Sequence, residues 1–259
     1  MNDVLEVLLK RKSVRAYKKQ AIPAEVRAQV LQATLRAPTA GNMMLYSIID
    51  VTEQRLKDRL AITCDHQPFI AKAPMVWLFL ADYQRWFDYF LQCGVEEACE
   101  HRGVPLRKPE EGDLFIACCD ALIAAQNAVI AAESLGLGSC YIGDIMEQYE
   151  THRDLFSLPR YTFPICLLCF GYPTQGQIDR PRTSRFDGKF ILFEDRYHPL
   201  TGEEFEEMFH KHKAARAKSG GSDAPSNFGQ SMYFRKFNAD FSVELNRSVR
   251  AMLKAWSGG

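Results

Sequence analysis

The segment from Asp113 to Leu135 constrains the fold of this chain more than any other. Apolar residues occur on almost every side of it: Ile116, Ala117, Ala121, Leu122, Ile123, Ala124, Ala125, Ala128, Val129 and Ile130. A helix that is apolar all round must be covered on every side, in a core or in a subunit interface. Gly136 and Gly138 follow, and we expect these glycines to end the helix.

Hydrophobic periodicity elsewhere predicts a mixture of helices and strands. Helical spacing is found at 3–10, 23–35, 53–61, 83–93 and 242–256. Short apolar or β-branched runs at 45–51, 74–81 and 164–171 predict strands. The stretch 213–229 is rich in Ala, Ser and Gly, which predicts a linker or mobile loop. Because helices and strands intermingle, the fold class is α/β or α+β.

Length and charge narrow the classes of protein to consider. The 259 residues suit one large domain or two small ones. Lys and Arg balance Asp and Glu at 32 each, so no global field attracts nucleic acid. No apolar run approaches the roughly 20 residues of a membrane span. The first residues lack the pattern of a secretory signal, which favours the cytoplasm.

The eight cysteines show no repeated metal-ligand spacing. Cys166 and Cys169 form the only C-x-x-C motif, inside an apolar run that predicts a buried strand. Residues three apart on a strand point to opposite faces, so one metal ion could not easily bind both thiols. Packing of reduced thiols in the core is the favoured interpretation, and it fits a reducing compartment. A redox pair or a cluster ligand remains the alternative.

Two short basic clusters lie far apart in the sequence. Arg11, Lys12, Ser13 and Arg15 follow the first predicted helix, and Arg180-Pro181-Arg182 lies far downstream. The planar guanidinium group of Arg fits a phosphate well, so the two clusters together indicate a polyanion site. The alternative for the first cluster is a solvated helix end whose cations offset the helix dipole.

Three further segments offer groups for a ligand. Small residues at 37–42, Ala-Pro-Thr-Ala-Gly-Asn, would let a backbone approach a flat ligand, although a plain loop is equally compatible. The G-x-G of 135–144 lacks the third glycine and follows a helix, so the dinucleotide fingerprint is not met, but a tight turn is expected at Ile142-Gly143. His66 is interpreted as a surface or capping residue rather than a catalyst. No catalytic triad, H-E-x-x-H motif or paired-carboxylate pattern is present.

Taken together and in order, these segments resemble the nitroreductase / flavin reductase family of FMN-dependent oxidoreductases. The resemblance is carried by RKSVRAY at 11–17, APTAGN at 37–42, Gln67 before Pro68, LGLGSCYIGD at 135–144, GYP at 171–173 and RPR at 180–182. It extends from the N-terminus to about Arg182. The stretch 227–249 also looks like a tail found in one subgroup of the family.

The resemblance implies an α+β fold, a three-layer sandwich with a central, mainly antiparallel sheet flanked by helices. It also implies an intertwined homodimer with one FMN at each of two interface sites. Residues 1–200 would form the FMN-binding domain. Residues 201–259 would be a C-terminal extension, with a mobile linker and a helix, that packs on the dimer.

The resemblance also assigns the cofactor-binding residues by position. Arg11, Ser13, Arg180 and Arg182, with Lys12 beside them, would bind the FMN phosphate. Arg15 would lie near N1 and O2 of the ring, and Gln67 would bond its polar edge. The ribityl chain and ring would be lined by Pro38, Thr39, Ala40 and Asn42. The turn near N5 would consist of Tyr141, Ile142, Gly143 and Asp144.

The implied activity is hydride transfer from NADH or NADPH, through flavin N5, to a nitroaromatic, a quinone or a similar flat acceptor. The cofactor performs this chemistry, so no catalytic side chain or metal is expected. Free-flavin reduction, another specialised activity of the fold and a non-catalytic flavin-binding module are the alternatives. Met44 replaces a frequent Gln and Asp144 a frequent Gly, which affects the expected substrate pocket more than the FMN site. Neutral charge argues against a nucleic-acid binder.

Overall fold

The computed structural model describes residues 2–217 and 227–258. Contacts divide the chain into two compact units, Met1–Arg180 together with Glu244–Gly259, and Pro181–Val243. The chain therefore leaves the first unit once and returns to it with its last helix. The division into 1–200 and 201–259 expected from the sequence stays a prediction, because compactness alone does not define a domain that folds independently.

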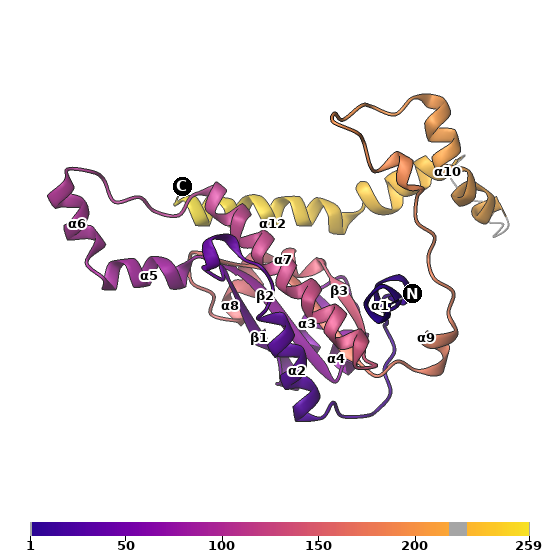
Figure 1. Cartoon of the computed structure of the whole chain (residues 1–259), viewed down its shortest axis with the longest axis horizontal. Helices are drawn as coiled ribbons and strands as arrows, with labels where there is room; N and C mark the ends of the chain where they lie inside the picture. Colours follow the sequence, from indigo (N-terminus) through magenta and orange to yellow (C-terminus); the bar gives the residue numbers. More distant parts are fainter. Residues whose placement is uncertain (1, 218–226, 259) are drawn as a thin grey trace. The chain divides into compact units, whose positions relative to one another are not determined.

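A single four-stranded sheet forms the centre of the first unit (Figure 1). The strands are β1 (Tyr46–Asp50), β2 (Met75–Asp82), β3 (Gly138–Ile142) and β4 (Thr162–Gly171). Their spatial order is β1-β2-β4-β3, and every neighbouring pair is antiparallel. This sheet confirms the α+β expectation and excludes the α/β alternative. Strand β3 was not expected, since the sequence predicted only a tight turn at Ile142-Gly143 in this stretch.

The long helices of the first unit agree with the periodicity of the sequence. They are α1 (Asp3–Lys10), α2 (Ala24–Thr34), α3 (Gln54–Thr63), α5 (Gln84–Gln92), α7 (Glu111–Ser134) and α12 (Asp240–Ser257), the last of which begins in the second unit. The short helices were not foreseen: α4 (Phe69–Lys72), α6 (Val95–Arg102), α8 (Tyr149–Leu155), α9 (Gln175–Asp179) and the 3-10 turns η1 (Ala40–Asn42) and η2 (Asp144–Met146).

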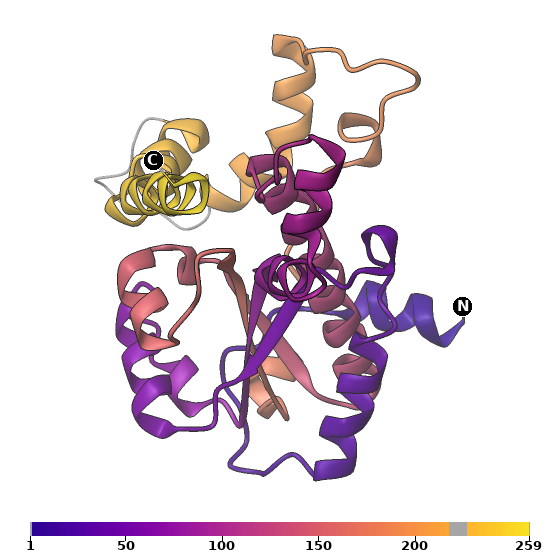
Figure 2. The ribbon, with the colours of Figure 1, turned by 90° about the vertical axis from the view of Figure 1, so that its left-hand side faces the viewer.

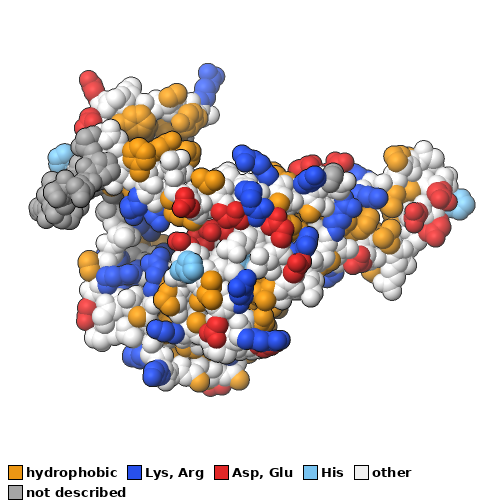
Figure 3. Space-filling view, turned by 180° about the vertical axis from the view of Figure 1, so that it is seen from behind, with side chains coloured by type: hydrophobic (Ala, Val, Ile, Leu, Met, Phe, Trp, Pro, Cys, Tyr) orange, Lys and Arg blue, Asp and Glu red, His pale blue; other side chains and the backbone are white. Residues whose placement is uncertain are grey.

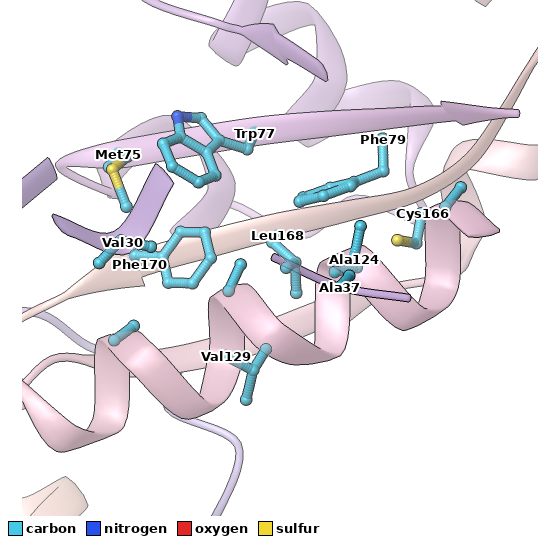
Figure 4. Close-up of a cluster of buried hydrophobic side chains, with 14 of the residues drawn as sticks. Val30, Ala37, Met75, Trp77, Phe79, Ala124, Val129, Cys166, Leu168 and Phe170 are labelled. Carbon is cyan, nitrogen blue, oxygen red and sulfur yellow. The ribbon is translucent and has the colours of Figure 1, made fainter. Parts of the chain in front are cut away.

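Helices cover both faces of the sheet, which gives the three layers seen in Figure 2. On one face, α7 and α2 pack on aromatic side chains of β2 and β4. Trp77 and Phe170 meet edge to face there, with ring centroids 5.7 Å apart. The helix contributes mainly small residues, among them Ala124 and Ala128, so it can approach the sheet closely (Figure 4). The large rings fill the space that these alanines leave.

The opposite face of the sheet packs on α3, α4 and η2, with Leu60, Ile70 and Ile145 in its core. Cys166 belongs to the first of these cores and Cys169 to the second. The prediction that the two thiols point to opposite faces is thus confirmed. All eight cysteines are free.

Helix α12 closes a third core at the end of the sheet. Trp256 is buried against Tyr161, with ring centroids 5.5 Å apart, and its Nε1 donates to the carbonyl of Glu110 at 3.1 Å. Ser248 Oγ donates to the carbonyl of Met146 at 2.7 Å, which attaches α12 to the η2 turn. The last helix is therefore an integral part of the first unit.

The apolar helix α7 has one covered and one uncovered side. Its inner side packs on β1, β2, β3 and β4, whereas Phe115, Ile116, Leu122 and Ile123 are exposed in the single chain. Among the described residues, α7 is the one helix long and apolar enough to cross a membrane, which the sequence analysis did not anticipate. Its packing on the sheet is that of a core helix.

The second unit contains α10 (Gly202–Ala217) and α11 (Phe228–Met232), followed by a π-helical turn, Tyr233–Phe237. The linker predicted over 213–229 is thus wrong at both ends, where the chain is helical, and its middle lies outside the described residues. Ala, Lys and Arg favour helix, and they outweigh the small residues at the start of this stretch. Lys and Arg side chains are interspersed with Asp and Glu over one face of the molecule, as the zero net charge suggests (Figure 3).

Candidate functional site

The first basic cluster runs along the free edge of β3. Ser13 pairs with Ser139 in a parallel bridge, and the backbone N–H of Val14 donates to the carbonyl of Ser139 at 2.8 Å. This close approach requires a glycine at 138, because a Cβ there would lie 2.5 Å from Val14 Cγ2. Gly136, with φ +78°, ends α7 as predicted, but Gly138 begins β3, so its assignment as a helix terminator was wrong.

Arg180 reaches the same edge from the far end of the first unit. Its guanidinium group donates to the carbonyl of Ser13. Lys12 Nζ donates in return to the carbonyls of Ile178 and Arg180, both at 2.5 Å. The two basic clusters thus meet through Arg180, as the sequence analysis anticipated. Arg182 belongs to the second unit.

Positive charge converges on this edge. Within the described residues, the guanidinium groups of Arg11 and Arg15 make no hydrogen bond or ion pair. Burial raises the pKa of the Cys140 thiol, while the charges of Arg15, Arg11 and Arg180 lower it, so all three groups act on one point of β3. A set of unpaired Arg groups with a neighbouring Ser hydroxyl has the donor chemistry that a phosphate requires.

Glu133, at the end of α7, is an acidic group near these cations that sequence reasoning missed. Its Oε1 accepts from Ser139 Oγ at 3.3 Å. Burial raises its pKa to about 7, although Arg11, the Ser139 hydrogen bonds and Lys12 lower it. Near neutral pH its carboxyl is thus partly protonated, which leaves more of the positive charge of Arg11 available to an anion.

A second group of polar side chains lies where β3 ends. Gln67, from the loop between α3 and α4, donates through Nε2 to Asp144 Oδ2 at 2.7 Å and to the carbonyl of Cys64 at 3.0 Å. Asp144 begins η2 directly after β3. The guanidinium group of Arg15 lies over the ring of Phe69, 6.0 Å from its centroid. Tyr141, on β3, donates to Gln126 Oε1 at 3.2 Å. Polar, cationic and aromatic groups thus surround the end of β3.

The segment 38–44 lies elsewhere in the single chain. Asp120, on α7, accepts from the backbone N–H groups of Ala40 and Leu45 at 3.0 and 3.1 Å. Glu133, beneath the phosphate-type site, lies thirteen residues further along the same helix, which corresponds to about 20 Å. The structure therefore does not bring Pro38, Thr39, Ala40 and Asn42 together with Arg11 within one chain.

This segment has an unusual backbone, since Gly41, Asn42 and Met44 all have positive φ, of 56°, 57° and 50°. Beside it lies a cavity of about 780 Å³, lined by Leu31, Leu35, Asn42, Met43, Met44, Tyr46, Ser47, Ile48, Arg85, Trp86 and Tyr89. The hydroxyl of Tyr46 is buried without a hydrogen-bond partner in the described part of the chain. The apolar and aromatic walls of this cavity suit a flat organic molecule.

Comparison with known proteins agrees with this fold. Residues 8–172 match the model of the nitroreductase family, and the chain belongs to this family.

Individual relatives support the same assignment. The chain is 32% identical to a Bacillus subtilis protein named FMN reductase (NADPH), over 70% of each sequence. It is 28% identical to the oxygen-insensitive NADPH nitroreductase of Salmonella typhimurium, over 77% of each sequence. Among solved structures, B. megaterium NfrA2 superposes with a TM-score of 0.80 at 24% identity, covering 99% of this chain and 98% of the other, which shows a shared fold.

Proposed function

We propose that this protein is an NAD(P)H-dependent FMN oxidoreductase that reduces nitroaromatics, quinones or similar flat acceptors. The observation that carries the proposal is the meeting of Arg11, Ser13 and Arg180 at the edge of β3, next to the polar group of Gln67 and Asp144. Relatives named FMN reductase (NADPH) and NADPH nitroreductase support the same cofactor and reductant.

The residues present fit FMN. Arg11, Ser13 and Arg180 would hold the phosphate; the role expected for Arg182 from the sequence stays a prediction. Gln67, Arg15 and the turn from Tyr141 to Asp144 would contact the ring. When bound, the flavin supplies hydride transfer from the nicotinamide to the acceptor.

The protein side chains supply position and electrostatics. Arg15 would place a positive charge at the ring end of the site, where it would stabilise negative charge on the ring. No acidic or basic side chain is needed for proton abstraction. His66, on the neighbouring loop, is not assigned a role.

The purified protein tests this proposal directly. It should be yellow, contain one FMN per chain and oxidise NADH or NADPH much faster when a nitroaromatic or quinone is added. Acceleration by free FMN alone would identify a free-flavin reductase instead. Flavin binding with no turnover would identify a non-catalytic module, and the absence of flavin binding would contradict the proposal altogether.

We further propose that the active form is a homodimer. In the single chain the outward side of α7 exposes Phe115 and Ile116, at 69% and 46% of their surface. A helix with no polar side has to be covered. A second copy would also supply the segment 38–42, which one chain holds about 20 Å along α7 from Glu133. Each cofactor site would then combine Arg11 and Gln67 of one chain with Thr39 and Asn42 of the other.

Replacing Ile116 with Glu is expected to weaken the dimer, because it places a charge in an apolar interface. Light scattering at low micromolar concentration should show monomer, and the flavin should be lost with the dimer. Ile62→Glu is the control, since Ile62 is 52% exposed on α3. A wild-type protein that is monomeric with FMN bound would contradict the proposed dimer.

Replacing Arg11 with Ala is expected to weaken FMN binding about ten- to 150-fold, the equivalent of one charge-assisted hydrogen bond of about 1.5–3 kcal/mol. Quenching of flavin fluorescence measures the dissociation constant. Riboflavin, which lacks the phosphate, should bind the variant and the wild type equally. Arg55→Ala, which removes a surface cation paired with Glu53, should leave the FMN affinity unchanged. Equal FMN affinity of the Arg11 variant and the wild type would exclude Arg11 from the phosphate site.

A further inference from the structure

Glu147 is a buried acid directly after the η2 turn. Only 5% of its surface is exposed, and its Oε1 has no hydrogen-bond partner among the described residues. A buried carboxylate without a cation is costly, so such a group is expected to keep its proton. The established fold gives this residue no role, and the sequence offered no signal for it.

The groups around Glu147 come from four elements, and the charges that act on it most strongly are acidic. Burial is the largest cause that raises the pKa of Glu147. The negative charges of Asp144, Asp65 and Glu244 raise it further, to about 8. The backbone N–H of Glu147 donates to the carbonyl of Asp144 at 3.0 Å, which places the two residues in one turn. Arg247, on α12, is bound to Glu150 and Glu244 and so does not neutralise the group.

The two titratable groups that remain nearby are held neutral. His152, on α8, is fully buried, and its Nδ1 and Nε2 lie 2.8 Å from the carbonyl of Ile145 and from Thr63 Oγ1. Burial, with a smaller effect of Arg59, lowers its pKa. The pKa of Cys64 is raised by burial and by Asp144 and Glu147. Neither group supplies a positive charge to Glu147 near neutral pH.

Asp144 connects this acid to Gln67. Both hydrogens of the Gln67 amide are occupied, because Nε2 donates to Asp144 and to the carbonyl of Cys64. The amide oxygen, which has no partner in the described part of the chain, is left for a ligand. An outward-facing acceptor matches a ring N–H, the one kind of donor that an oxidised flavin ring carries.

We propose that the buried Glu147 keeps its proton near neutral pH, and that it is a positioning residue that fixes the Gln67 amide, through Asp144, with its oxygen available to the cofactor. With Glu147 protonated, Asp144 stays an acceptor and holds the Gln67 NH₂ group. Once Glu147 ionises, the adjacent carboxyl groups repel each other, Asp144 moves, and the Gln67 amide is held less firmly, by the Cys64 carbonyl alone. The expected effect of Glu147 on cofactor binding rests on the proposed function. The protonation of Glu147 beside Asp144 does not depend on that function.

Nuclear magnetic resonance of the flavin-free protein tests this protonation without using activity. The side-chain NH₂ signals of Gln67, assigned with Gln67→Ala, should shift with pH in the wild type, with a midpoint near pH 8. They should be independent of pH in Glu147→Gln, which is neutral at every pH. Asp65→Asn, which removes a more distant acid, should keep the titration and move its midpoint to lower pH. Wild-type signals that do not change between about pH 6 and 10 would overturn the proposal.

Thermal unfolding gives a second readout. The folded pKa of Glu147 lies above its ordinary value of 4.5, so the folded state binds more protons than the unfolded state between the two values. The melting temperature of the wild type should therefore fall as pH rises from about 5 to 9, and Glu147→Gln should show a smaller fall. Identical pH profiles would contradict a buried, protonated Glu147.

Binding of FMN at pH 7 and pH 9 then connects Glu147 to the cofactor. Wild-type affinity should fall about two- to tenfold more than that of Glu147→Gln, the equivalent of one neutral hydrogen bond. If the protein does not bind FMN, the proposed function fails, while the Gln67 signals still decide whether Glu147 keeps its proton. If FMN binds both proteins with the same pH dependence, the positioning role is overturned.

Discussion

Asp120→Ala is expected to lower the free energy of unfolding by about 3–6 kcal/mol. The carboxylate is buried in α7 and accepts two backbone hydrogen bonds, from Ala40 and Leu45. Each bond to a charged group contributes about 1.5–3 kcal/mol, and its loss would leave a backbone N–H without a partner. Urea or guanidinium unfolding, monitored by circular dichroism, measures the change.

The same substitution should release the segment that Asp120 holds. Flavin affinity is expected to fall with it, although Asp120 itself is not placed at the phosphate. Asp88→Ala, which removes an exposed carboxylate from α5, should change stability by no more than about 0.5 kcal/mol. A loss below about 1 kcal/mol for Asp120→Ala would show that the segment is held by other contacts, such as the bond from Trp86 Nε1 to the Met43 carbonyl at 2.6 Å.

Gly138→Ala is expected to destabilise the protein by about 1–3 kcal/mol through overpacking. The added Cβ would lie 2.5 Å from Val14 Cγ2 and 2.8 Å from Val14 Cβ. The segment that carries Arg11 and Ser13 would have to move away from β3, so FMN affinity should fall as well. Gly112→Ala is the control, because a Cβ at Gly112 meets nothing within 4 Å.

A double mutant separates crowding from other effects of Gly138→Ala. Val14→Ala removes Cγ1 and Cγ2 and leaves only the Cβ at 2.8 Å, so the crowding is partly relieved and the pair should be more stable than the sum of the single changes predicts. FMN affinity should recover in parallel. Additive losses in the double mutant would show that the cost at Gly138 does not come from contact with Val14.

Most of the long elements could be predicted because their residues are strongly periodic. Strands β2 and β4 and helix α7 follow from runs of apolar residues, and α12 follows from apolar residues at helical spacing. Strand β3 could not, because Gly138-Ser139-Cys140 has a composition typical of a turn. Its extended conformation depends on pairing with β4 on one side and with Ser13 on the other, which no local pattern reports.

Some residues of the candidate site could be predicted from the sequence and others could not. Residue chemistry indicated that the clusters of Arg11 and Arg180 could bind one polyanion. The resemblance to a family assigned both residues to the same phosphate. Asp120 could have been found from the sequence, since a lone acid on a buried helix face requires partners. Glu147 could not, because η2 and α12, nearly a hundred residues later in the chain, together bury it.

The first unit depends on a covalent connection between α12 and the rest of its residues. This unit is assembled from two separate stretches of sequence, and the excursion Pro181–Val243 acts as a tether between them. A chain cut within the excursion would keep α12 in place only through its own contacts, such as Trp256 with Glu110 and Ser248 with Met146. The intact tether holds α12 at an effective concentration that is set by the length and stiffness of the tether. The covalent connection therefore makes the closure of this core independent of how dilute the protein is.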